Sequence, residues 1–168
     1  MEINLELLER ACALLAETTP LKTDCGLLCD AACCRDNKDA GSGVWLLPGE
    51  DATQMDWGCA AQLQLPSSGR QLRMLYCNGM CSRPLRPFLC RIFPLAPYYS
   101  NKEKRWDVRM DRRAAALCPL FAYGKRGLAP EFVQAAGQAV QLLSQDEAFE
   151  QVLIDLQAEE DAIRRLSL

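Results

Sequence analysis

Apolar positions near the N-terminus follow helical spacing. Leu5, Leu8, Cys12 and Leu15 recur every three or four residues, which predicts an amphipathic helix that ends before Pro20. Cys12 lies within the apolar stripe of this helix. A buried cysteine packs as a small hydrophobic side chain, so Cys12 is not expected to belong to a functional site.

The C-terminal segment has the same periodicity. Apolar residues recur at helical spacing over 130–143 and again over 146–166, with Pro130 in a first turn and Asp146 as an N-cap. The short connection predicts an antiparallel helical hairpin over about 130–166. We expect this hairpin to pack on the rest of the chain; the alternative is that its apolar stripe forms a homodimer interface.

Between these helical ends the alternation has a period of two and comes in short runs. Strands are predicted over 44–47, 60–65, 71–77 and 106–111, the middle two forming a hairpin. The expected fold class is α+β. Residues 1–168 are predicted to form a single domain, with an irregular, cysteine-rich, metal-binding core of short strands over about 24–119. The N-terminal helix and the C-terminal hairpin flank this core.

Composition changes the picture in two respects. The chain has ten cysteines and no histidine among 168 residues, which excludes Ser-His-Asp catalysis, Cys-His catalysis and histidine-ligated metal. Its net charge of -3 gives no reason to expect a nucleic-acid partner. The chemistry therefore has to come from thiols, carboxylates and backbone groups.

The expected compartment is the cytoplasm. The first ten residues are acidic and amphipathic, unlike a secretory signal, and no segment is apolar for long enough to suggest a membrane span. Thiols stay reduced in the cytoplasm. Nine cysteines within 24–119 therefore favour metal ligands over a disulfide framework.

The first group of cysteines is Cys25, Cys29, Cys33 and Cys34. If this segment is helical, the first three sulfurs lie on nearly one face; if it is a loop, Gly26 lets the backbone fold around an ion. The side chains of the adjacent pair are expected to diverge. One of the two would then serve a second ion, bridge two ions or be buried.

The second group is Cys77, Cys81 and Cys90. A short helix starting near Pro87 would place Cys90 in its first turn, where the helix dipole would lower the thiol pKa. Arg86 and Arg91 flank Cys90. They are expected to offset the -2 charge of a tetrathiolate zinc site, or else to be ordinary surface residues.

Two further cysteines are less constrained by their surroundings. Cys118 follows an apolar run, and either closes the metal site or is a core cysteine. Cys59 has the same two interpretations. The candidate ligands are thus Cys25, Cys29, Cys33, Cys34, Cys77, Cys81, Cys90 and Cys118.

The cysteine run resembles that of the CxxCxxCC family of zinc- or iron-chelating proteins, to which segments of flagellin lysine N-methylases are related. The resemblance covers about residues 25–94. It is carried by the four cysteines of the first group and by the segment Arg86-Pro87-x-x-Cys90-Arg91-x-Phe93-Pro94, and 47–50 is similar to a turn of that family. Gaps of three residues replace the gaps of two in the family's run. The resemblance implies metal chelation by the cysteines.

The expected function is zinc binding through clustered thiolates without catalysis, with iron as the alternative metal. Soft thiolate ligands select zinc, iron–sulfur clusters or copper(I). Two other functions remain open: an iron–sulfur or thiol oxidoreductase, and an accessory of a protein methyltransferase. The role as a methyltransferase accessory rests on the resemblance to the methylases alone.

Overall fold

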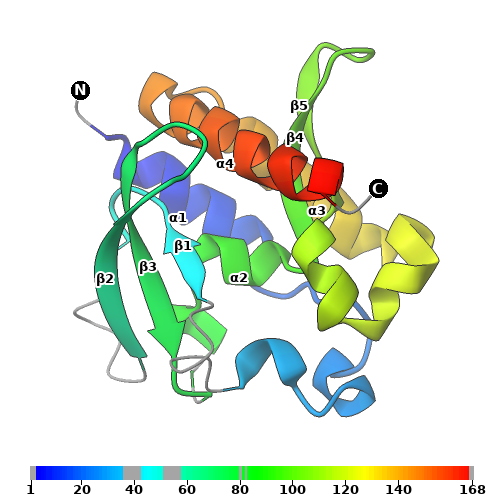
Figure 1. The fold of residues 1–168 in the computed structure, drawn as a ribbon. Helices are drawn as coiled ribbons and strands as arrows, with labels where there is room; N and C mark the ends of the chain where they lie inside the picture. The colour runs from blue at the N-terminus through cyan, green and yellow to red at the C-terminus, as the bar shows by residue number, and fades with distance from the viewer. Residues whose placement is uncertain (1–2, 36–42, 51–57, 80, 82, 167–168) are drawn as a thin grey trace.

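The structure is a computed structural model, and it describes residues 3–35, 43–50, 58–79, 81 and 83–166. It has the expected α+β class. These described residues form four α-helices, short 3-10 helices and two antiparallel sheets (Figure 1). None of the described helices combines the length and apolarity needed to cross a bilayer.

The N-terminal helix α1 (Leu5–Leu14) begins where Asn4 accepts a hydrogen bond from the Leu7 N–H, 3.3 Å. Its Leu8 and Ala11 are buried in the main core, as the periodicity predicts, and Cys12 packs against that core. The helix ends six residues before Pro20, earlier than expected. The carbonyls of Ala16 and Thr18, which follow the helix, accept hydrogen bonds from the Arg83 guanidinium.

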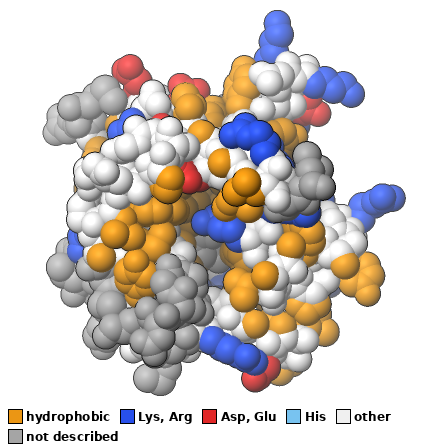
Figure 2. All heavy atoms as spheres, viewed as in Figure 1, with side chains coloured by type: hydrophobic (Ala, Val, Ile, Leu, Met, Phe, Trp, Pro, Cys, Tyr) orange, Lys and Arg blue, Asp and Glu red, His pale blue; other side chains and the backbone are white. Residues whose placement is uncertain are grey.

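The predicted hairpin forms as β2 (Gly58–Gln64) and β3 (Gln71–Cys77), whose register pairs Gln64 with Gln71. The predicted strand near residue 45 is β1 (Val44–Leu46). It pairs antiparallel with the other side of β3, which gives the order β1-β3-β2. On the face drawn in Figure 2, hydrophobic side chains gather over this sheet and around a hollow beside it.

The second sheet contains one strand that the sequence predicts, β5 (Arg105–Met110), and one that it does not, β4 (Leu95–Ser100). Pro97 breaks the usual strand pattern because proline has no N–H for the ladder. Its partner in register is Val108, whose carbonyl oxygen faces away from β4 and accepts a hydrogen bond from Lys125 Nζ, 2.8 Å. The Asp111 N–H donates to the Pro94 oxygen, and bonded pairs alternate along an antiparallel ladder, so Pro97 and Val108 form a non-hydrogen-bonded pair and the ladder loses no bond at the proline.

The C-terminal hairpin is α3 (Pro130–Leu143) and α4 (Glu147–Leu166). Asp146 caps α4 as predicted, since its carboxylate accepts from the N–H groups of Ala148 and Phe149 at 2.9 and 3.1 Å. α3 packs on α1 and β5, and α4 packs on β4 (Figure 1). The apolar stripes of both helices are buried within the chain, and the homodimer through them stays a prediction.

One hydrophobic core connects the two ends of the chain to its middle. Phe132 of α3 and Phe149 of α4 are fully buried beside Phe88 of α2 (Phe88–Ile92). Ion pairs then attach α4 to the sheets, Arg70 with Asp155 and Arg109 with Glu160. The core therefore fixes α2, and with it the cysteine-rich region.

Candidate metal centre

Six thiols from separate parts of the chain line one cavity of about 220 Å³. They come from the 3-10 turns after α1, from the end of β3, from the loop that follows β3, and from α2. These thiols are Cys25, Cys33, Cys34, Cys77, Cys81 and Cys90. Residues as far apart in sequence as 25 and 90 thus meet at one place.

The first cysteine run is folded as two separate 3-10 turns, η1 (Cys25–Leu28) and η2 (Ala32–Cys34). Asp30 and Ala31 between them have φ angles of 52° and 49°, which a continuous right-handed helix does not allow. Of the two expected conformations, the structure has the loop. Asp24 caps the first turn by accepting from the Gly26 N–H at 2.9 Å.

The adjacent thiols of Cys33 and Cys34 converge, and the expectation that they diverge is wrong. Their sulfur atoms lie 3.8 Å apart because the turn η2 places both side chains on the same side. The hydrogen bond between these thiols lowers the pKa of Cys34 and raises that of Cys33.

The thiol of Cys77 sits at the end of β3, where the chain turns sharply. Gly79 has a φ of 88°, a conformation that favours glycine, and its N–H donates to Cys77 Sγ at 3.3 Å. This turn brings Cys81 back toward Cys77. N–H···S hydrogen bonds of this kind stabilise the negative charge of a thiolate.

The thiol of Cys90 lies in the short helix α2, as the sequence predicts, but its pKa shifts in the opposite direction to the expected one. Burial raises the pKa of Cys90, and the nearby thiolate charges of Cys34 and Cys81 raise it further. Desolvation therefore outweighs the dipole of a five-residue helix. In the absence of a cation, Cys90 is a protonated thiol.

Glu50 positions α2 and was not identified from the sequence. Its carboxylate accepts from the Phe88 N–H at 2.6 Å and from the Leu47 N–H at 2.7 Å, so it caps α2 and closes the 47–50 turn. Burial raises the pKa of Glu50 to about 7. Gly49 in that turn has a φ of 91°, a conformation that favours glycine.

We expect the change Glu50→Ala to lower the free energy of unfolding by about 1–3 kcal/mol, because two N–H donors lose their acceptors. Urea denaturation followed by circular dichroism measures this effect. Glu9→Ala removes an exposed glutamate on α1 and is the matched control, with an expected change below about 0.5 kcal/mol. Equal effects of the two substitutions would contradict the capping role of Glu50.

The two predicted arginines lie at the cavity in different roles. Arg86 Nε donates to Cys81 Sγ at 3.3 Å and thus contacts a thiol directly. Arg91 donates to the backbone oxygens of Arg86 and Pro84, 2.8 and 2.7 Å, and so holds the turn that carries Arg86. Arg83, which the sequence analysis missed, attaches the same turn to the segment after α1.

The remaining two candidate ligands, Cys29 and Cys118, lie beside Cys25 and not on the lining of the cavity. Burial raises the pKa of Cys118, and the negative charge of Cys29 adds to that effect. The backbone N–H groups of Leu120 and Phe121 lower the pKa of Cys118 and partly oppose the effect of burial. Cys118 is thus part of the thiol-rich region rather than of the main core alone.

The thiols gather without forming a finished coordination sphere. Within residues 3–35, 43–50, 58–79, 81 and 83–166, no three Cys, Asp or Glu side chains lie close enough together to hold a metal ion. Cys59 belongs to β2 by its backbone, but its side chain lies outside the described residues. Binding an ion would therefore require rotation of the thiol side chains around the cavity.

Comparisons with protein families, with curated proteins and with solved structures find no significant match for this chain.

Proposed function

We propose that this protein binds a thiophilic metal ion, zinc in the first place, through its clustered cysteines. The observation that carries the proposal is the convergence of six thiols from separate segments on one small cavity. The donor chemistry suits the ion, because soft thiolates bind zinc, iron–sulfur clusters or copper(I) in preference to magnesium or calcium. The resemblance to the CxxCxxCC family rests on the same cysteines and remains a hypothesis.

The thiols fall into two groups of four according to which neighbouring cysteines shift the pKa of each one. Cys90 interacts with Cys34, Cys77 and Cys81, and these four form the inner group. Cys25, Cys29 and Cys118 interact with one another, and Cys33 interacts with Cys25 and Cys29, which gives the outer group. The strongest neighbour of Cys33 is Cys34 of the inner group, so the two groups meet at this 3.8 Å contact. Four thiolates complete a tetrahedral zinc site, so we propose about two ions per chain.

Charge supports the inner group as an ion site. Four thiolates around Zn²⁺ carry a net charge of -2, which requires compensation in a partly buried place. The guanidinium of Arg86, in contact with Cys81, supplies a positive charge at the right position. A zinc ion with four thiolates has no open coordination position for a substrate, so the proposed role is structural or storage rather than catalytic.

The proposal is tested by the metal content of the chain purified without oxygen. Zinc at about two ions per chain, without acid-labile sulfide, is the expected result. Iron with an equal amount of sulfide would replace the zinc proposal by an iron–sulfur cluster. A chain that takes up neither metal when offered each in solution would overturn metal binding.

A second candidate function, thiol–disulfide exchange, is favoured by the adjacent pair. Cys33 is exposed, and its hydrogen bond lowers the pKa of the neighbouring Cys34 thiol. Such a thiolate attacks a disulfide, forming a mixed disulfide and releasing the other sulfur as a thiolate. If this is the function, metal-free Cys34 reacts with iodoacetamide much faster than Cys90, and added zinc does not protect it.

Both functions require reduced thiols. We therefore propose a reducing compartment, the cytoplasm, as the location of the protein.

A further inference from the structure

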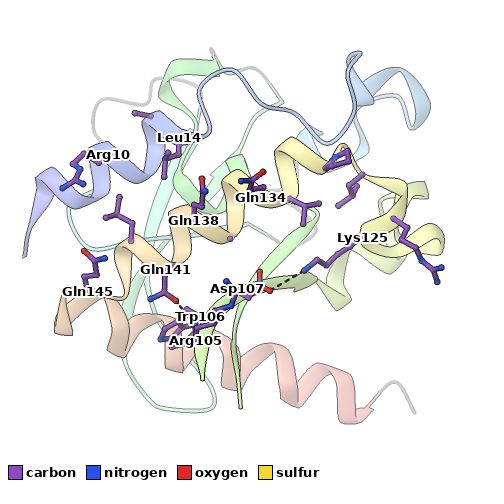
Figure 3. A pocket seen from close by; sticks show the side chains of 17 residues that line it. Arg10, Leu14, Arg105, Trp106, Asp107, Lys125, Gln134, Gln138, Gln141 and Gln145 are labelled. Atoms are coloured by element: carbon purple, nitrogen blue, oxygen red, sulfur yellow. Dashed lines mark hydrogen bonds and ion pairs between the residues drawn. The ribbon is translucent and has the colours of Figure 1, made fainter. Parts of the chain in front are cut away.

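A second concave surface lies away from the cysteines, between α1, α3, β5 and the 3-10 segment η6 (Pro119–Gly127) (Figure 3). It is an open groove of about 1310 Å³, large enough for a chain segment rather than a small ligand. Leu14, Val133 and Leu142 contribute apolar side chains to its lining. None of the candidate metal ligands lines this groove, so it is independent of the proposed metal site.

One wall of the groove is a row of glutamines on α3 and in the turn that follows it. Gln134, Gln138 and Gln141 are spaced by four and three residues, which places them on one face of α3, and Gln145 lies in the turn after the helix. Gln141 is engaged, because its oxygen accepts from the Trp106 N–H at 3.0 Å. The other three are exposed, and their amides make no hydrogen bond to any other residue that the structure describes.

Basic side chains lie at both ends of this row. Arg10 of α1 lies at one end and Lys125 at the other, with the glutamines between them (Figure 3). Neither Arg10 nor Arg126, which also lines the groove, has an ion-pair partner among the described residues. Asp107 is the one acidic residue in the described lining, and Lys125 Nζ lies 3.8 Å from it. The groove is therefore electropositive, although the chain has a net charge of -3.

We infer that this groove binds an extended acidic peptide segment of a partner protein. Glutamine amides offer both a donor and an acceptor, which matches the N–H and C=O groups of an extended backbone. The guanidiniums of Arg10 and Arg126, which have no ion-pair partner among the described residues, match carboxylates. A nucleic acid fits less well, because Trp106, the aromatic residue in the lining, is only 4% exposed and offers no stacking surface.

Fluorescence anisotropy with the metal-loaded full chain tests this inference. The probe is a labelled peptide in which aspartate and glutamate alternate with alanine; its control carries asparagine and glutamine in their place. We expect the acidic peptide to bind, the amide peptide to bind at least about tenfold more weakly, and salt to weaken the binding. The double change Arg10→Gln with Arg126→Gln should weaken binding about tenfold, whereas Arg165→Gln on the exposed end of α4 should not.

Four results would overturn the inference. The first is that the acidic peptide does not bind at millimolar concentration, and the second is that the double variant binds it as well as the unchanged chain does. The third is tighter binding of a single-stranded oligonucleotide of the same charge, which would make the groove a nucleic-acid site. Self-association of the chain that the double variant abolishes would instead assign the groove to a second copy. None of these results depends on how many metal ions the chain holds.

Discussion

Replacing Cys90 with serine is expected to lower the zinc content from about two ions per chain to about one. Cys90 is the inner-group thiol that α2 supplies, and the core and the Glu50 cap hold that helix in place. Serine keeps the size of the side chain but is a poor zinc ligand, so the inner site loses one of its four thiolates. Loss of a structural zinc site costs several kcal/mol, and the melting temperature should fall accordingly.

The matched control for Cys90→Ser is Cys12→Ser. Cys12 is a partly buried cysteine of α1, and burial raises its pKa to about 11, but none of the charges that shift its pKa is a thiolate. This change should leave both zinc ions in place. It should lower the free energy of unfolding only through the loss of packing around the side chain. Cys118→Ser should remove the outer ion and spare the inner one. Full zinc content in Cys90→Ser would disprove the inner group as we have assigned it.

Zinc affinity should fall steeply as the pH is lowered from about 8 to about 6. Burial raises the pKa of the thiols of Cys25, Cys77, Cys90 and Cys118, so without metal these thiols hold their protons throughout this range. Zinc binds the thiolates, so the outer ion displaces up to about four protons and the inner ion up to about three, because the hydrogen bond from Cys33 lowers the pKa of Cys34 to about 6. Lower pH therefore favours the protonated, metal-free chain. The steepest dependence that four released protons allow is a change of about four powers of ten in zinc affinity for each pH unit.

Competition with a chromophoric chelator at several pH values measures this dependence. Proton release in weakly buffered solution gives an independent count of the thiols that bind. An affinity that stays constant between about pH 6 and 8 would mean that the ligands are already deprotonated or are not thiols.

Much of the fold could be predicted from the sequence because its elements carry strong local signals. The apolar spacing of α1, α3 and α4, the Asp146 cap and the alternation of β2 and β3 all lie within short windows. β4 could not be predicted in this way, because Pro97 contradicts strand propensity. Pro97 is tolerated because it lies at a non-hydrogen-bonded position of the ladder, which is set by the register with β5 and not by the local sequence.

The candidate site was predicted in part. Cysteine counts indicate which residues matter, but they do not show which thiols meet, because that depends on β3, α2 and the first cysteine run coming together. The resemblance marks the 47–50 turn, but the bond from the Phe88 N–H to Glu50 and the bonds of Arg83 to the segment after α1 join groups far apart along the chain, so no local pattern reveals them. The pKa shift of Cys90 follows from burial, which a spacing argument does not include.

X-ray absorption at the zinc edge tests the central claim most directly, because it identifies the atoms around the metal. The account predicts a first shell of about four sulfur atoms at about 2.3 Å, for both ions alike. The chain has no histidine, so an imidazole signal cannot come from this sequence. A first shell of oxygen or nitrogen, or the absence of bound zinc, would contradict the claim that the cysteine cluster is a metal centre.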